Sequence, residues 1–352
     1  MLRKIFVQEM QSKAKLDAFY SLRKNEVQKS VKDVLGKDGI PIDVGLLAFS
    51  TVINMITSMF WGGAIQRNKG AGTNAEFRAA VSELLVILGK PNISDFIPSL
   101  ARFDLQGIER NVKKASKRIE QIFDSRSRHW KSLSRAQMKA FLADIVIGGT
   151  GTTSTAFEWT MAELMLHPET MNKVQEDLIE VVGANKIVEE YHIYKLPYLH
   201  AVVKEALRLH PPAPLLLPRS PTRSCTVGGY TIPKGARVFM NAWAMHRDPQ
   251  FWNDPLEFQP ERFIGDHADN LDYLGKNFHY IPFGSGRRIC AGLPLGQRML
   301  MYILATFLHM FEWKMSDGEM PDTREKLGIV LEKLTRLIVI ATPRFCTLEL
   351  YK

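Results

Sequence analysis

Residues 283–292 read Phe-Gly-Ser-Gly-Arg-Arg-Ile-Cys-Ala-Gly, and an apolar run from Leu293 through Phe307 follows them directly. The run predicts a helix, so Cys290 lies in a glycine-hinged loop at the mouth of that helix. A helix N-terminus and unpaired backbone N–H groups both favour a thiolate over a thiol. Gly284 and Gly286 allow a tight turn and let the backbone approach a flat ligand without a Cβ in the way. We therefore expect Cys290 to be an anion that faces a ligand.

The residues around Cys290 fit the same role. Phe283 can pack beside the sulfur and keep water away, and Arg288 can reach an acidic group on the edge of the ligand. A lone loop cysteine is usually a small buried hydrophobe, but the spacing argues against that interpretation. The pattern Phe-x-x-Gly-x-Arg-x-Cys-x-Gly, filled by Phe283, Gly286, Arg288, Cys290 and Gly292, resembles the haem-thiolate loop of the cytochromes P450.

That resemblance implies a fold, a cofactor and an activity. The fold is mainly α with small β-sheets, in a single cytochrome P450 catalytic domain over residues 1–352. The cofactor is haem b, iron protoporphyrin IX, with Cys290 as the proximal iron ligand that pushes electron density toward O–O cleavage. Arg288 and Arg219 would each bind a haem propionate. The activity is a monooxygenase reaction that inserts one oxygen atom of O2 into a hydrophobic small molecule.

Composition leaves the class of partner open. The formal net charge of +9 suggests an acidic partner, an anionic membrane surface or nucleic acid, and a generally basic surface is an equal alternative. The resemblance implies no role for nucleic acid. Three distant cysteines, Cys225, Cys290 and Cys346, offer neither a disulfide framework nor a paired-cysteine metal site, which fits a reducing compartment. No run approaches the roughly 20 apolar residues that span a bilayer.

A long helix is predicted from about Ser134 to Leu166, with Ser134 as N-cap. Its middle, residues 148–153, reads Gly-Gly-Thr-Gly-Thr-Thr, and each interior glycine costs about 1 kcal/mol relative to alanine. Such a breach of local preference is expected where a ligand approaches the backbone. A strand running into a dinucleotide-binding turn is the alternative, but Gly149-Thr150-Gly151 lacks the third glycine and a βαβ unit.

The resemblance assigns the catalytic candidates to this helix. Thr152 matches the threonine of the family's oxygen-binding helix, which holds a water and helps to deliver protons to bound O2. Gly151 stands where the family usually has an acid, and Thr153 follows as the third candidate. Asp144 and Glu158 lie seven residues to either side of Gly151, on one helical stripe, and we expect one of them to feed protons through water.

Apolar residues are expected to line the substrate pocket. They are Ile147, Gly148, Leu215, Leu216, Ile329 and Val330. A pocket lined in this way favours a hydrophobic substrate that is positioned by shape. Ordinary core packing is an equal alternative for each of these residues taken singly.

Glu205 and Arg208 are i, i+3 neighbours on a helix predicted from Leu196 to Leu209, a spacing usually worth only a few tenths of a kcal/mol. Followed by His-Pro-Pro at 210–212, the pair resembles the Glu-x-x-Arg pair of the cytochromes P450. The tetrapeptide Pro-Glu-Arg-Phe at 260–263 resembles the family's partner segment. The resemblance therefore implies a buried triad of Glu205, Arg208 and Arg262 with a structural role.

The remaining chain predicts further helices and short strands. The helices are expected at 1–36, 43–60, 74–88, 106–123 and 169–182. Strands are expected at 226–232, 237–243, 329–331 and 337–340. The segment from 74 to 123, with a loop at 93–105, resembles the lid over the family's substrate channel; an ordinary surface hairpin is the alternative.

Residues 195–199, Lys-Leu-Pro-Tyr-Leu, and residues 282–288 look like plant microsomal cytochromes P450. The resemblance implies a plant secondary metabolite such as a terpenoid or phenolic as substrate. It also implies electrons from an NADPH-dependent cytochrome P450 reductase, and a place on the endoplasmic reticulum membrane facing the cytosol. A basic face that includes Arg287 and Lys276 would suit an acidic reductase.

Residues 1–4, Met-Leu-Arg-Lys, look like the end of the family's Trp-x-x-x-Arg motif, with Arg3 as its propionate-binding arginine. We therefore expect the family's membrane anchor and β-rich N-terminal lobe to be absent from this chain. Two hypotheses stay open, a monooxygenase and a truncated haem-binding remnant without turnover. A haem-thiolate isomerase or dehydratase is disfavoured because Thr152 and an uninterrupted cysteine loop are both present.

Overall fold

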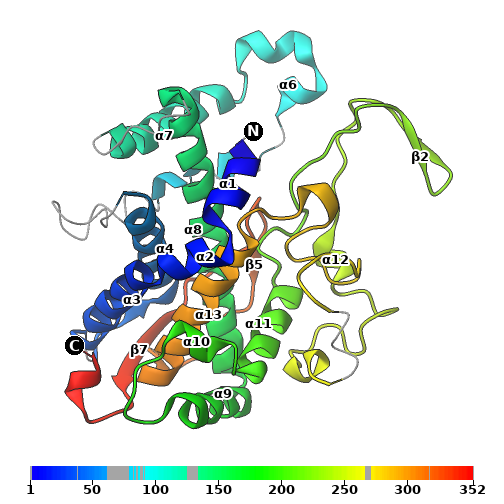
Figure 1. Ribbon diagram of the computed structural model, residues 1–352. Coiled ribbons are helices and arrows are strands. Elements are labelled where there is room, and N and C mark those ends of the chain that lie inside the picture. Colours follow the sequence, from blue (N-terminus) through cyan, green and yellow to red (C-terminus); the bar gives the residue numbers. More distant parts are fainter. Residues whose placement is uncertain are drawn as a thin grey trace.

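The fold is mainly helical, as predicted (Figure 1). The structure, a computed structural model, describes residues 2–37, 39–61, 79–81, 83, 84, 86, 87, 90, 92–124, 134–265, 271–316 and 318–351. Most of the predicted helix 74–88 lies outside these residues. The α-helices are α1 (Leu2–Met10), α2 (Lys13–Ala18), α3 (Tyr20–Leu35), α4 (Val44–Trp61), α6 (Ile93–Phe96), α7 (Ile108–Asp124), α8 (Arg135–Leu166), α9 (Pro168–Val182), α10 (Glu190–Ile193), α11 (Pro197–Leu209), α12 (Ala242–Met245) and α13 (Leu293–Met310).

Short 3-10 helices and strands complete the fold. The 3-10 helices are η2 (Pro98–Phe103), η3 (Pro260–Phe263), η5 (Gly286–Arg288) and η6 (Leu348–Tyr351). The strands are β1 (Ile42–Asp43), β2 (Cys225–Val227), β3 (Tyr230–Ile232), β4 (Phe311–Met315), β5 (Glu325–Lys326), β6 (Glu332–Lys333) and β7 (Ile338–Pro343).

The long helix α8 runs unbroken through its glycines. Ser134 caps it, accepting a hydrogen bond from the backbone N–H of Gln137, whose side chain returns the bond in a capping box. Helix α4 packs along α8. A Cβ on Gly149 would lie 3.0 Å from Cδ1 of Ile56 in α4, so this glycine permits the close approach of the two helices.

Helix α13 forms the centre of the core. Every residue from Met299 to Met310 is buried, and the helix packs against α3, α8, α9, α10 and α11. This part of the helix is largely apolar on all sides because neighbours surround it. It runs directly into β4 and carries Cys290 just before its N-terminus, so the core holds the cysteine loop in place.

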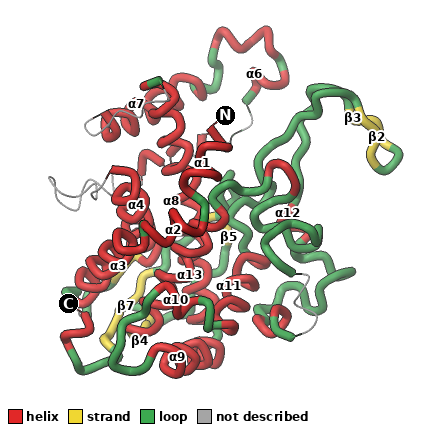
Figure 2. Tube along the Cα trace, viewed as in Figure 1, coloured by secondary structure: helices red, strands yellow, loops and turns green. Residues whose placement is uncertain are grey.

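A three-stranded antiparallel sheet, in the order β1-β7-β4, joins the two ends of the chain. Ile42 of β1 faces Val339 of β7, and Trp313 of β4 faces Ala341. Two hairpins, β2–β3 and β5–β6, stand apart from this sheet. In Figure 2 helices fill one side of the molecule, loops fill much of the other, and the β2–β3 hairpin projects outward.

Some of the predicted local structure is wrong. Residues 237–243 form no strand beyond an isolated bridge between Arg219 and Val238, because the side chain of Asn241 accepts from the N–H of Ala244 and caps α12. Residues 329–331 lie in the turn of the β5–β6 hairpin, and the predicted loop 93–105 contains α6 and η2. Among the described residues, no helix is both long and apolar enough to cross a bilayer.

Candidate haem-thiolate site

Backbone hydrogen bonds close the cysteine loop. The N–H of Cys290 donates to the carbonyl of Phe283 at 2.9 Å, and the N–H of Ile289 donates to the carbonyl of Gly286 at 3.1 Å. Gly284 and Gly286 have φ angles of +74° and +65°, a region that side chains with a Cβ rarely adopt. The loop therefore needs glycine at both positions to make this turn.

A neighbouring glycine that the sequence analysis missed supports this loop. Gly275 has φ +68°, and a Cβ there would lie 2.4 Å from the carbonyl oxygen of Gly284. The Ser285 hydroxyl donates to the carbonyl of Gly275 at 2.6 Å. An isolated glycine in an irregular segment was the only signal in the sequence, and the contact partner is ten residues away.

The prediction that the loop makes Cys290 an anion is wrong in its net direction. Withdrawal of water from the sulfur raises the pKa of Cys290, and this effect exceeds those of the groups that lower it. Those groups are the backbone N–H groups of Gly292 and Leu293 and the positive charge of Arg3, so the helix N-terminus does act in the expected sense. A bound metal ion deprotonates a coordinating thiol outright, so Cys290 fits a ligand that brings its own cation.

Arginine side chains gather around the loop. Nη2 of Arg3 donates to the carbonyl of Ile289 at 2.5 Å. Nη2 of Arg219 lies 3.8 Å from the point where a Cβ on Gly284 would stand. Arg288 lies in η5 and is exposed. The structure therefore brings Arg3 and Arg219, which are far apart in sequence, to the same loop.

Helix α8 presents two different faces near this loop. A Cβ on Gly148 would meet no atom within 4 Å, and the Thr152 hydroxyl donates to the carbonyl of Gly148 at 2.7 Å. By contrast, Thr153 is buried, and its Oγ1 lies 4.0 Å from a Cβ placed on Gly296 of α13. Thr153 therefore packs between helices, whereas Gly148 lies on a face open to a ligand. Gly151, one residue before Thr152, is half-buried.

The two candidate proton donors differ in their surroundings. Glu158 is buried and accepts a hydrogen bond from the N–H of Leu337 at 3.1 Å, at the entry to β7. Its charge also raises the pKa of Lys333, although burial of Lys333 outweighs it and the net pKa is lowered. Burial raises the pKa of Asp144. Glu158 is therefore engaged in holding β7, which argues against a role in proton delivery.

The predicted substrate residues lie in three segments. Cδ1 of Leu216 lies 3.7 Å from a Cβ placed on Gly284, so this leucine reaches the cysteine loop. The carbonyl of its neighbour Leu215 accepts from the N–H of Met240 at 3.3 Å. Ile329 and Val330 lie in the β5–β6 turn, where Val330 is buried. Ile147 is half-buried on α8 and packs against the core.

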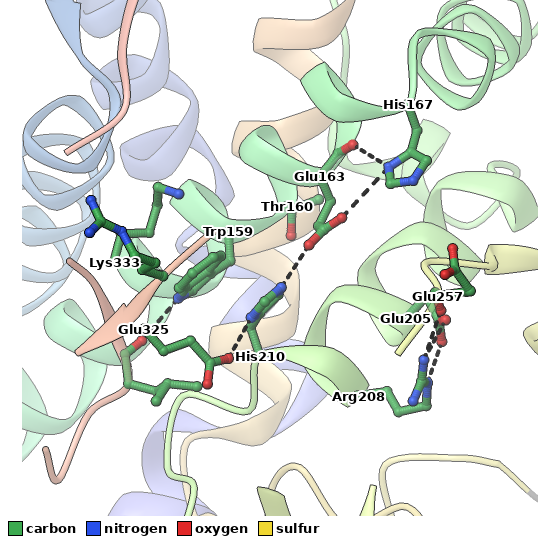
Figure 3. Close-up of polar contacts among 12 residues, drawn as sticks. Trp159, Thr160, Glu163, His167, Glu205, Arg208, His210, Glu257, Glu325 and Lys333 are labelled. Carbon is green, nitrogen blue, oxygen red and sulfur yellow. Dashed lines mark hydrogen bonds and ion pairs between the residues drawn. The ribbon is translucent and has the colours of Figure 1, made fainter. Parts of the chain in front are cut away.

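The triad forms a closed ionic cluster. Arg208 donates from Nε and Nη2 to both carboxylate oxygens of Glu205, at 2.7 and 2.8 Å, and neither side chain is exposed (Figure 3). Nη1 of Arg208 also donates to the carbonyls of His246 and Pro255. Arg262 contacts Glu205 more loosely, with Nε 3.3 Å from Oε1. Arg208 therefore ties α11 to the loops after α12.

These residues fit a haem. Within the described part of the chain, no group of three or more His, Cys, Asp or Glu side chains could hold a metal ion. The chain instead has a single thiol in the glycine-containing loop, arginines that can bind acidic groups of a ligand, and a face of α8 at Gly148 that no side chain of the described residues covers. Cys290 would ligate the iron, and Arg3, Arg219 and Arg288 would meet the propionates.

A lone thiol on a glycine-hinged loop, beside a long helix that contains several glycines, fits a haem-thiolate protein. The sequence model of the family described as cytochrome P450 matches residues 1–131 and 121–339 of this chain. The chain belongs to the cytochrome P450 family, and it is a cytochrome P450 monooxygenase.

Curated relatives are plant enzymes. A geranylhydroquinone 3''-hydroxylase of Arnebia euchroma is 36% identical, over 97% of this chain and 75% of the relative. A geraniol 8-hydroxylase of Swertia mussotii is 37% identical, over 97% and 74%. A flavonoid 3'-monooxygenase of Petunia hybrida is 35% identical, over 98% and 74%. A zebra fish cytochrome P450 solved with abiraterone is 24% identical with a TM-score of 0.74, covers 97% of this chain and 81% of its own, and shares the fold.

Proposed function

We propose that this chain hydroxylates a hydrophobic plant secondary metabolite, a terpenoid or phenolic. The observation that carries the proposal is the Cys290 loop, closed by the bond from the Cys290 N–H to the Phe283 carbonyl and hinged at Gly284 and Gly286. The relatives' names support the substrate class, because they refer to geraniol, geranylhydroquinone and flavonoids. We further propose that residues 1–352 act as a single catalytic domain.

Different residues of this chain bind the cofactor, hold a water and contact the substrate. Haem, when bound, supplies O2 activation and the oxidising power. Cys290 holds the iron, and the arginines neutralise the acidic edge of the cofactor. The Thr152 hydroxyl donates to Gly148 and keeps its lone pairs for a water, so it can hold a proton donor near the open face of α8. Leu216, Ile329 and Val330 exclude water and orient an apolar substrate.

The electrons would come from NADPH through a cytochrome P450 reductase, on the cytosolic face of the endoplasmic reticulum membrane. Lys276 and Arg287 are exposed in and near the cysteine loop, and the apolar side chains of Leu274 and Phe278 are exposed on either side of Lys276 in the sequence. Exposed basic and apolar side chains together suit an acidic flavoprotein, since charges steer the encounter and apolar contacts stabilise the complex.

The test of the haem site is the reduced carbon monoxide difference spectrum. The wild-type chain, loaded with haem, should show the red-shifted Soret band of thiolate ligation, and C290A should lose it. C225A is the matched control, because it also removes a free thiol but one that lies on the β2–β3 hairpin. A thiolate band in C290A would refute the assignment. A wild-type chain that binds haem with this band but yields no product with reductase would support the remnant hypothesis instead.

The role of Thr152 has its own control on the same helix. The Thr150 hydroxyl also donates to a carbonyl four residues earlier, that of Val146, at 2.7 Å, but Thr150 is fully buried. T152V should lower product per NADPH and raise peroxide release by about tenfold or more, whereas T150V should leave the product-to-peroxide ratio unchanged. Equal coupling in T152V and wild type would contradict the role of Thr152.

A further inference from the structure

His210, directly after α11, is held between two carboxylates. Its Nε2 lies 2.7 Å from Oε1 of Glu163 on α8, and its Nδ1 lies 2.9 Å from Oε1 of Glu325 on β5 (Figure 3). His210 and Glu163 are both buried, with 6% and 5% of their surfaces exposed. We call these three residues the His210 clamp. None of them belongs to the haem-thiolate site or to the Glu205 triad.

The clamp is a charge-assisted contact. Ionised carboxylates only accept hydrogen bonds, so both contacts are hydrogen bonds when both ring nitrogens carry hydrogen. Each carboxylate also contacts a nitrogen from outside the clamp. Arg247 lies 3.0 Å from Glu325, and Nδ1 of His167 lies 3.6 Å from Glu163. Burial raises the pKa of Glu325, but the hydrogen bond from His210 and the charge of Arg247 outweigh it and lower that pKa.

Trp159 connects the clamp to the β5–β6 hairpin. Its ring stacks on the His210 ring, with centroids 3.8 Å apart and planes 5° apart, and its Nε1 donates to the carbonyl of Leu331 at 3.0 Å. The ammonium group of Lys333 also contacts the Trp159 ring and lies 4.4 Å from the ring centroid. Trp159 thus contacts the clamp, the turn of the hairpin and strand β6.

The clamp therefore anchors both segments that we assign to the substrate. Glu325 lies on β5, and Glu325 pairs with Lys333 across the hairpin that carries the turn 327–331. The second segment, 213–217, follows His210 directly in the chain. The two segments are also joined to each other, because the N–H of Leu331 donates to the carbonyl of Pro212 at 3.0 Å. One histidine thus ties both segments to α8, which carries Gly148 and Thr152.

We propose that His210 is a positioning residue for the oxidation: clamped by Glu163 and Glu325, it fixes segments 213–217 and 327–331 against α8 and so sets how an apolar substrate lies. An apolar substrate makes few directional bonds, so its orientation depends on how rigidly the walls of its pocket are held. A small displacement of such walls can cost about a hundredfold in rate. This inference rests on the proposed function, because the segments matter only where an apolar substrate binds.

Hydrogen exchange tests the clamp without turnover. H210F keeps a ring stacked on Trp159 but removes both contacts to the carboxylates. In the haem-loaded protein, the Leu331 amide and the amides of segment 213–217 should exchange at least about tenfold faster in H210F than in wild type. H309F is the matched control, because His309 is also buried and bonds the carbonyl of Lys186 at 3.0 Å, away from both segments. Unchanged exchange of the Leu331 amide in H210F would overturn the clamp.

Conservative variants separate positioning from general damage. In E163Q an amide can still hydrogen-bond His210, whereas in E163A it cannot. Geraniol and naringenin serve as probes, and their affinity is measured by the substrate-induced absorbance shift. In H210F and E163A this affinity should fall about tenfold, and hydroxylation should occur at more than one position of the probe. E163Q and H309F should keep the wild-type product. Wild-type affinity and product in H210F, despite faster exchange of Leu331, would overturn the positioning role.

The same experiments separate this inference from the proposed function. Loss of the thiolate band in the wild-type chain, or no response of that chain to either probe, would count against the proposed function. The exchange of the Leu331 amide still decides the clamp in that case. A retained thiolate band in H210F, with a changed product, supports both.

Discussion

Replacing Gly275 by alanine tests whether the cysteine loop depends on a glycine outside it. The new Cβ would lie 2.4 Å from the Gly284 carbonyl oxygen and 2.9 Å from Cα of Ser285, and both are backbone atoms of the loop. Because backbone atoms cannot rotate away, the loop itself must shift. Forcing an L-residue into the left-handed region costs about 1–2 kcal/mol, and overpacking adds about 1–3 kcal/mol. G275A should therefore lose roughly 2–5 kcal/mol of unfolding free energy.

G318A isolates the contact from the backbone strain. Gly318 has φ +75°, close to the +68° of Gly275, but a Cβ there would meet nothing within 4 Å. G318A should therefore lose only the conformational part, about 1–2 kcal/mol. Urea unfolding followed by circular dichroism measures the difference between the two variants.

The haem-loaded protein supplies the second measurement for the same pair. A shifted loop should misplace Cys290, so G275A should lose much of the thiolate band in the carbon monoxide spectrum, while G318A keeps it. Equal stability losses in G275A and G318A, together with an intact thiolate band in both, would refute the argument that Gly275 positions the loop.

The structure ranks the members of the triad and predicts a pH dependence. Arg208 binds Glu205 through two nitrogens and is fully buried, whereas Arg262 makes one longer contact. In urea unfolding, R208K should therefore lose about 2 kcal/mol or more of unfolding free energy beyond the loss in R262K. Equal losses in the two variants would contradict this ranking. Burial lowers the pKa of His246 to about 3 and that of His309 to about 4, from 6.5. The unfolded chain binds protons below pH 6.5 while these folded histidines stay neutral, so the unfolding free energy should fall as pH drops from 6.5 toward 4, by up to about 1.4 kcal/mol per pH unit for each histidine. H309F should reduce the change of the unfolding free energy with pH. An unchanged pH dependence in H309F would contradict this role of His309.

The sequence was sufficient to predict features whose stabilising interactions join residues only a few positions apart. Ser134 as the N-cap of α8 is confirmed, since the cap and its partner Gln137 lie three residues apart. The glycines of the cysteine loop could be predicted in the same way, and the loop motif led to the family. The boundaries of α9 and α11 were predicted to within one residue, and in the structure both helices begin at a proline, Pro168 and Pro197.

The sequence alone determined the family and the helical class, and it singled out Cys290 as the candidate ligand, because a short motif and helical periodicity carry that information. Tertiary structure decided which groups face each other. Only the fold shows that Gly275 supports the loop, that Thr153 faces α13 while Gly148 faces open space, and that His210 joins Glu163 to Glu325. The last three residues span 163 to 325, and no local pattern can encode a contact over that separation. The direction of the Cys290 pKa shift also needed the tertiary structure, because desolvation of the sulfur depends on the atoms that the fold places around it.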